Sequence, residues 1–198
     1  MGPWLVAGPL GASKTAGAMN PLAAHERAQS AFAAVLSAVR PDQLETPTPC
    51  TEWSVRDLVA HVIAGNHRVA GSPAPELPDD LPTLIQLHAA SARAAQATFA
   101  APGGLEREYV TRMGSMPGTV IVGMRARDAL VHAWDLAKAT GQPTDIEPEL
   151  AKEALEVSRQ IVTDQLRGPG RPFGPEMRCD PGRPAGDRLA AFLGREVD

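Results

Sequence analysis

Prolines divide this chain into long segments that can form helices. The sequence of 198 residues contains 19 prolines, about twice the usual share of roughly 5%. They cluster in PAPELPDDLP (73–82) and RGPGRPFGPEMRCDPGRP (167–184), and because proline interrupts both helices and central strands, these stretches are predicted to be connections. The segments between them are rich in alanine, and their apolar residues recur three and four positions apart, which indicates amphipathic helices.

The first two helical segments carry clear start signals. At 20–40, Asn20 is a suitable N-cap and Pro21 takes the first helical position, where its missing N–H costs nothing. At 54–71, Ser54 and Asp57 resemble a capping box, with Asp in place of the usual Glu. Further helices are predicted at 81–100, at 117–141 with Gly141 as the C-terminal glycine, at 147–168, and as a short turn or helix at 185–195.

The number and length of these helices predict an all-α fold, an antiparallel four-helix bundle with an additional C-terminal helix. The long connection between the second and third helices would permit a crossover. No convincing pair of strands emerges, although residues 105–113 alternate briefly and could form a short extended segment. Residues 19–198 are expected to form a single domain. Residues 1–18 lack the features of a signal peptide and are interpreted as a leader or a cloning remnant, because Met19 could be the natural start.

Composition limits the partners. The formal net charge is −4, aromatic residues make up 4% of the chain, and the charges are scattered, which argues against nucleic-acid binding. No apolar run reaches the ~20 residues that span a bilayer. Cys50 and Cys179 are too few for a disulfide framework and are expected to be ordinary reduced thiols. These features predict a cytoplasmic monomer or homodimer that acts on a small molecule.

The fourth predicted helix places Asp128, His132 and Asp135 within a narrow arc, because residues three and four positions apart share one side of a helix. The same side also carries Arg125, Arg127 and Lys138, whereas the opposite side is apolar. Taken alone, this pattern is typical of a surface helix with a solvated polar face. It also fits half of a metal site, provided that another helix supplies a further ligand.

His61 is the candidate for that further ligand. It lies at the edge of the apolar stripe of the second helix, close in angle to Leu58, so it is expected to face inward or to border the core. The other histidines are less convincing: His25 sits among charges, His67 lies on the opposite side from Leu58, and His88 lies on an alanine-rich helix without an evident partner. A histidine and an acid four residues apart, with a histidine from another helix, can form a metal site in a bundle, but chance also produces this spacing often.

The two motifs that contain these residues carry a family resemblance. TPCTEWSVRDLVAHVIAGN (48–66), followed by RDALVHAWDLAKATGQ (127–142), resembles the DinB-like superfamily of metal-binding four-helix bundles. The resemblance is strongest to the actinobacterial branch that includes the N-terminal domain of mycothiol-dependent maleylpyruvate isomerase. The tail FGPEM…DRLAAFLGR is also similar to that family, so the resemblance extends over roughly residues 20 to 195.

The resemblance implies that His61, Asp128 and His132 hold a divalent metal ion. The isomerases have Glu where this chain has Asp128, so the acid is one methylene shorter here. They also carry a second, C-terminal domain that contributes to the active site and that this sequence does not contain, so isomerisation of maleylpyruvate itself is not expected. Asp135 could support His132 from behind or line the entrance, and Asn66 and Arg125 are candidate substrate-binding residues.

Two imidazoles and one carboxylate would leave a zinc-like ion with an open position for water or for a thiol that becomes a thiolate. Nickel, manganese or iron(II) would accept the same ligands. The resemblance implies mycothiol as the thiol co-substrate, and hence transfer of the thiol to, or isomerisation of, a small organic electrophile. A thiol-independent Lewis-acid enzyme (isomerase, cyclase or hydrolase) and a non-catalytic metal-binding protein remain alternatives.

Overall fold

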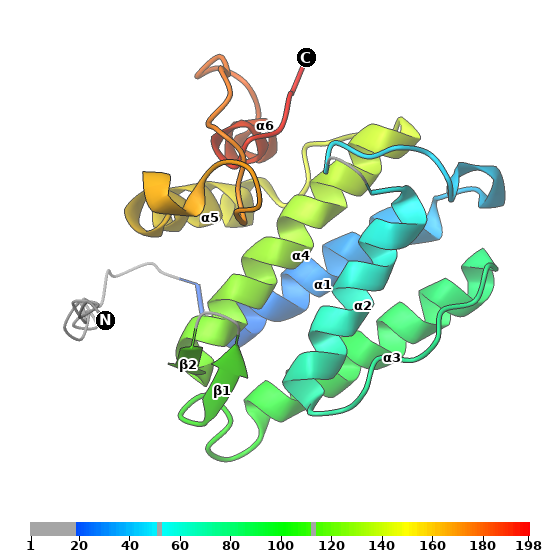
Figure 1. Ribbon diagram of the computed structural model, residues 1–198, viewed down its shortest axis with the longest axis vertical. Coiled ribbons are helices and arrows are strands. Elements are labelled where there is room, and N and C mark those ends of the chain that lie inside the picture. Colours follow the sequence, from blue (N-terminus) through cyan, green and yellow to red (C-terminus); the bar gives the residue numbers. More distant parts are fainter. Residues whose placement is uncertain (1–18, 51–52, 112–113) are drawn as a thin grey trace.

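The structure is a computed structural model, and it describes residues 19–50, 53–111 and 114–198. The interpretation of residues 1–18 as a leader or a remnant lies outside the described residues. Four long helices form the body of the molecule (Figure 1): α1 (Pro21–Ser37), α2 (Val55–Ala70), α3 (Leu81–Ala100) and α4 (Gly118–Thr140). The all-α fold and the four-helix bundle predicted from the sequence are confirmed.

The bundle contains one crossover, which places α2 beside both α3 and α4. Helices α1 and α4 run in one direction and α2 and α3 in the other (Figure 1). Helix α1 packs against α3 and α4, and α2 also packs against α3 and α4. Because α2 and α3 are parallel neighbours, the connection at 71–80 has to run back along the bundle. This is the connection in which the sequence permits a crossover.

The predicted helix caps are present. The Asn20 side chain accepts hydrogen bonds from the backbone N–H groups of Leu22 and Ala23, and Ser54 and Asp57 form a reciprocal capping box. Gly141 ends α4 with a φ of 72°, in the left-handed region that glycine adopts without a steric penalty. The cap at Ser54 matters for the site, because α2 begins there and positions His61 two turns later.

A small hairpin precedes α4 and corrects the expectation that no strand pair forms. Strands β1 (Glu108–Thr111) and β2 (Gly114–Pro117) pair antiparallel, with Tyr109 opposite Met116. The Tyr109 ring is buried and its hydroxyl donates to the Gly104 carbonyl. Sequence patterning suggested only the first of these strands, because the second begins with Gly and ends with Pro, both of which are disfavoured in strands. Tertiary packing of Tyr109 outweighs that preference.

The C-terminal region lies against the outside of α4 (Figure 1). It comprises α5 (Pro148–Ile161), a short 3-10 helix η2 (Asp164–Leu166) and α6 (Ala185–Phe192); another 3-10 helix, η1 (Pro41–Gln43), follows α1. The fifth helix was predicted to continue to residue 168 and instead ends at Ile161. Val162 takes an extended backbone conformation and is buried in the same apolar cluster as Leu189 and Leu193. Packing against residues 185–198, the C-terminal segment, therefore ends the helix there.

Among the residues that the structure describes, none of the helices combines the length and the apolar character required to cross a membrane.

The bundle interior also contains a buried polar cluster, which the sequence did not indicate. His25 Nδ1–H donates to Gln96 Oε1 over 2.6 Å, and His88 Nε2–H donates to Gln29 Oε1 over 3.1 Å. The amides of Gln29 and Asn66 bond each other reciprocally. His25 and His88 are therefore buried, hydrogen-bonded residues, and the expectation that His88 lacks a partner is wrong.

These two histidines should make the bundle sensitive to acid. Burial lowers the pKa of His25, and it lowers the pKa of His88 to about 4. Because the unfolded chain takes up protons near pH 6.5 and the folded protein does not, the free energy of unfolding should fall as the pH drops from about 6.5 to 4, with His88 contributing about 3 kcal/mol. Urea unfolding of His88→Gln should show a correspondingly smaller pH dependence. An unchanged slope in His88→Gln would contradict this account.

Candidate metal centre

Part of the polar side of α4 is covered rather than solvated. His132 is 5% exposed and Asp135 is fully buried, so the interpretation of this side as the solvated face of a surface helix is wrong for both residues. The C-terminal segment around Arg195 covers Asp135, and Trp53 and His61 lie against His132. The sequence of α4 alone does not reveal that His132 and Asp135 are buried, because the residues that cover them are distant in the sequence.

The three predicted metal ligands lie together, on α2 and α4. His61 Nε2 is 3.3 Å and His132 Nε2 is 3.6 Å from the same carboxylate oxygen, Oδ1 of Asp128. The candidate ligand atoms of the three residues all lie within 4.8 Å of one another. The side chains of His61 and Asp128 are 35% and 29% exposed, whereas that of His132 is 7% exposed. The cluster is therefore open to solvent on one side and closed on the other.

These spacings fit a tetrahedral metal ion. Two ligand atoms that each lie about 2.0–2.1 Å from a tetrahedral zinc ion are about 3.3 Å apart. The two nitrogen–oxygen distances at Asp128 Oδ1 are close to that value, and both exceed the usual 2.7–3.2 Å of a hydrogen bond (about 2.9 Å is typical). The residues present thus suit a divalent ion by donor type and by spacing, although Asp128 is a shorter acid than glutamate.

Arg125 holds the other oxygen of the Asp128 carboxylate. Its Nη1 donates to Asp128 Oδ2 over 2.8 Å, and its Nη2 donates to the Val62 carbonyl over 3.3 Å. The guanidinium group reaches α2 because residue 65 is glycine: a Cβ atom there would lie 2.3 Å from Arg125 Nη2. Burial raises the pKa of the Asp128 carboxyl, but the positive charges of Arg125 and His132 outweigh burial and hold that pKa well below its usual range.

Asp135 contacts His132 on the side of the ring away from Asp128. His132 Nδ1 is 3.0 Å from Asp135 Oδ2, so with Nδ1 as the donor, Nε2 is left to face Asp128 and a metal ion. A carboxylate that accepts from the second ring nitrogen is the common outer partner of a metal-bound histidine. Burial lowers the pKa of His132, but Asp128 and Asp135 together raise it to about 9. Protons and a metal ion would therefore compete for Nε2.

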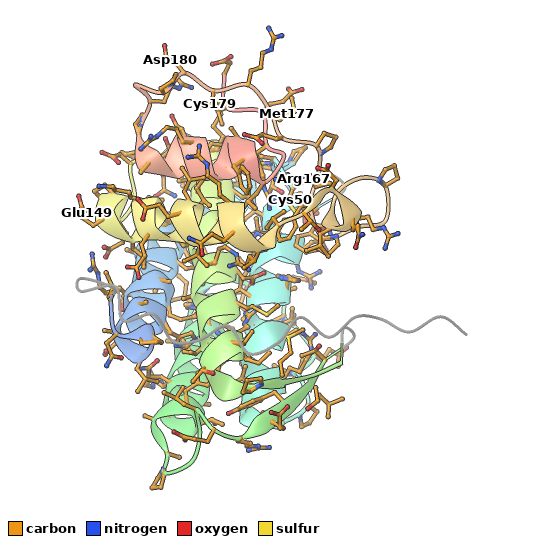
Figure 2. The ribbon with its side chains drawn as sticks, turned by 90° about the vertical axis from the view of Figure 1, so that its left-hand side faces the viewer. Cys50, Glu149, Arg167, Met177, Cys179 and Asp180 are labelled. Carbon is orange, nitrogen blue, oxygen red and sulfur yellow. The ribbon has the colours of Figure 1, made fainter. Side chains whose placement is uncertain are left out.

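Three residues near the ligands were not predicted to belong to the site. Arg195 forms an ion pair with Asp135 over 3.1 Å. The Trp53 ring lies 4.7 Å from the His61 ring, centroid to centroid. Cys50 has a ligand atom within 4.8 Å of those of His132 and Asp135; Figure 2 labels this residue. No motif in the sequence signals that the segment before α2 and the C-terminus meet at α4.

Cys50, His132 and Asp135 form a second possible metal-binding group, but its chemistry is less favourable. The Asp135 carboxylate already accepts hydrogen bonds from His132 and from two nitrogen atoms of Arg195. Burial and the negative charge of Asp135 raise the pKa of the Cys50 thiol to about 11, so a metal ion would have to displace a more tightly held proton there than from an ordinary thiol. The group around Asp128 is the better candidate.

Of the two candidate substrate-binding residues, only Arg125 lies at this cluster. The Asn66 side chain is fully buried and bonds to Gln29 and Ser91, so it belongs to the polar cluster between α1, α2 and α3. The position of Asn66 five residues after His61 explains this difference, since five residues along a helix turn a side chain well away from the first.

Comparison with known proteins identifies relatives of this chain. A family described as the mycothiol maleylpyruvate isomerase N-terminal domain matches residues 25–137, which is more than half of the chain. Two uncharacterized proteins from two strains of Mycobacterium tuberculosis, MT0763 and Rv0738, are each 52% identical over 184 residues, covering 90% of this chain and 100% of each relative.

Solved structures show the same fold. The crystal structure of the mycothiol-dependent maleylpyruvate isomerase aligns with a TM-score of 0.56 at 19% identity, over 68% of this chain and 66% of that chain. A point mutant of the same isomerase aligns with a TM-score of 0.58 at 20% identity, over 76% of this chain and 72% of that one. At such low identity these structures establish the fold alone, whereas the family match extends to the sequence of α1 to α4. The chain belongs to the mycothiol maleylpyruvate isomerase N-terminal domain family.

Proposed function

We propose that this protein is a metal-dependent enzyme that activates a low-molecular-weight thiol, mycothiol, for transfer to or isomerisation of a small organic electrophile. The observation that carries the proposal is the cluster of His61, Asp128 and His132. Its two nitrogen–oxygen distances match the spacing of two ligands on one tetrahedral ion, and it opens to solvent on one side. A site built only for structural stability would be expected to provide four protein ligands and to be closed.

The donor set favours zinc as the ion. Two neutral imidazoles and one carboxylate leave a divalent ion with one net positive charge, and three protein ligands leave one of four positions free. Nickel, manganese and iron(II) also accept nitrogen and oxygen donors. When bound, such an ion would supply the Lewis acidity that keeps a coordinating thiol in its thiolate form at neutral pH.

The residues around the cluster have distinct roles in this proposal. Arg125 binds the outer oxygen of Asp128 and so fixes the direction of the inner one. The indole of Trp53 lies beside both imidazole rings and forms an apolar wall against which a substrate can pack. His61 and Asp128 are the more exposed ligands, so the thiol and the electrophile would approach from their side.

Mycothiol is proposed because of the family to which the chain belongs. The family description names mycothiol, and both solved structures reported above are of a mycothiol-dependent isomerase. The chemical requirement is an electrophilic carbon that a thiolate can attack, because sulfur is the nucleophile in this proposal.

Mycothiol binding can be measured directly with cobalt-substituted protein. Addition of mycothiol should produce sulfur-to-cobalt charge-transfer absorption in the near ultraviolet. It should also release about one proton per thiol near neutral pH, since a free thiol with a pKa of about 8.5 must lose its proton to coordinate. His61→Ala should lose both signals, whereas His67→Ala, which changes a partly exposed histidine on the same helix outside the cluster, should keep them. Cobalt-loaded wild type that shows neither signal would contradict the thiol assignment.

Thiol dependence of turnover then separates two kinds of enzyme. Once a substrate is found, activity should require mycothiol and should return when mycothiol is added back to thiol-free protein. Full activity without any thiol would reject the proposed thiol chemistry and indicate a Lewis-acid enzyme that uses the same metal site.

Asp128 provides a second test, of the metal ligands themselves. Asp128→Asn keeps the size of the side chain and removes its charge, so zinc affinity should fall by at least about 100-fold, more than the loss of an outer partner typically costs. Asp128→Glu should retain zinc, because Glu offers the same carboxylate. Competition with a chromogenic chelator measures these affinities, with Glu156→Gln on the exposed face of α5 as the matched control. Wild-type affinity in Asp128→Asn would remove Asp128 from the ligand set.

A further inference from the structure

Arg195 connects the C-terminal segment to the candidate metal site. Its Nε is 3.2 Å from Asp135 Oδ1 and its Nη2 is 3.1 Å from Asp135 Oδ2. Two parallel bonds between a guanidinium group and a carboxylate fix the plane of the carboxylate as well as its position. Asp135 is fully buried and the Arg195 side chain is 11% exposed, so solvent screens this ion pair little.

The same carboxylate determines where the His132 ring points. Asp135 Oδ2, which accepts from Arg195 Nη2, also accepts from His132 Nδ1. The imidazole can present Nε2 to the Asp128 side only while the carboxylate keeps its place on the Nδ1 side. The order of contacts is therefore Arg195 to Asp135 to His132, and a shift of the carboxylate plane would tilt the ring.

Arg195 is itself held in place. Its Nη1 donates to the Leu193 carbonyl over 3.1 Å, and its Nη2 lies 4.0 Å from Cys50 Sγ. The C-terminal segment has other anchors as well. Lys138 Nζ donates to the Val197 carbonyl over 3.0 Å, and Trp134 Nε1 donates to Asp187 Oδ1 over 2.8 Å. Loss of Arg195 would therefore free the Asp135 carboxylate while other contacts still dock the segment.

We propose that Arg195 is a positioning residue of the metal site, whose paired contact with Asp135 fixes the carboxylate that orients the His132 imidazole. The inference rests on the proposed function, because it assigns Arg195 to the site that would hold the metal. It also assigns a role to the C-terminal segment, which lies outside the family match at 25–137. The C-terminal segment then helps to position a metal ligand, in addition to its packing against α4.

Three variants of the full chain test this role. Arg195→Met removes the ion pair and keeps much of the side-chain volume. Arg195→Lys keeps the charge, but an ammonium group cannot make the paired contact. Lys138→Met is the matched control, because it removes a different cationic anchor of the same segment. Zinc affinity is measured by competition with a chelator, the ligand geometry by the visible spectrum of cobalt-loaded protein, and folding by urea unfolding.

The expected pattern distinguishes positioning from simple anchoring. Zinc affinity should fall about 10–100-fold in Arg195→Met, as is typical for an outer partner of a metal-bound histidine. The cobalt spectrum should change with it, and Arg195→Lys should recover part of both losses. Lys138→Met should keep the wild-type affinity and spectrum. If Arg195→Met does not fold, the comparison of Arg195→Lys with Lys138→Met carries the test.

The possible failures can be told apart. Wild-type protein that binds no metal would overturn the proposed function, and this inference with it. Wild-type protein that binds metal while both Arg195 variants keep its affinity and spectrum would overturn this inference alone. Equal losses in the Arg195 variants and in Lys138→Met would also overturn it, since Arg195 would then act only by docking the segment.

Discussion

The buried carboxylate of Asp135 is the constraint on which the site depends. A carboxylate that is fully removed from water is costly unless it is paired and hydrogen-bonded, and Asp135 is fully buried on α4. His132 and Arg195 satisfy it, and together they hold the pKa of Asp135 below its usual value despite burial. Satisfying this one charge brings α4 and the C-terminal segment together and leaves the other nitrogen of His132 facing Asp128.

The bundle contains two groups of polar residues, and they differ in how far solvent reaches them. The cluster around Gln29 and Asn66 is enclosed by α1, α2 and α3, and its amides and imidazoles mostly satisfy one another. Nδ1 of His88 has no partner among the described residues. The cluster around Asp128 instead mixes two imidazoles with a carboxylate and is open to solvent beside His61. The first arrangement suits a specific core, and the second suits binding of an ion and a small molecule.

Local signals in the sequence predicted most of the fold. Together with the family resemblance they pointed to the three residues that lie together around Asp128, whereas contacts between distant segments could not be predicted. Asn20, Ser54 and Gly141 mark helix ends through local hydrogen bonds and backbone conformation, so their effect is visible in a short stretch of sequence. Helical spacing placed Asp128 and His132 on one face, and the resemblance to a family indicated His61. Arg195 and Cys50 are 60 and 85 residues from Asp135, and Asn66 was misplaced because its partners come from α1 and α3. No local pattern encodes those contacts.

Zinc-edge X-ray absorption of zinc-loaded protein tests the central claim, that His61, Asp128 and His132 hold one metal ion. The account predicts about one zinc per chain with a shell of nitrogen and oxygen atoms at about 2.0–2.1 Å, scattering from two imidazole rings, and no sulfur in the absence of added thiol. The absence of stoichiometric zinc would contradict the account. A sulfur atom at about 2.3 Å would also contradict it, because it would place the ion on Cys50 and the Asp135 side of His132.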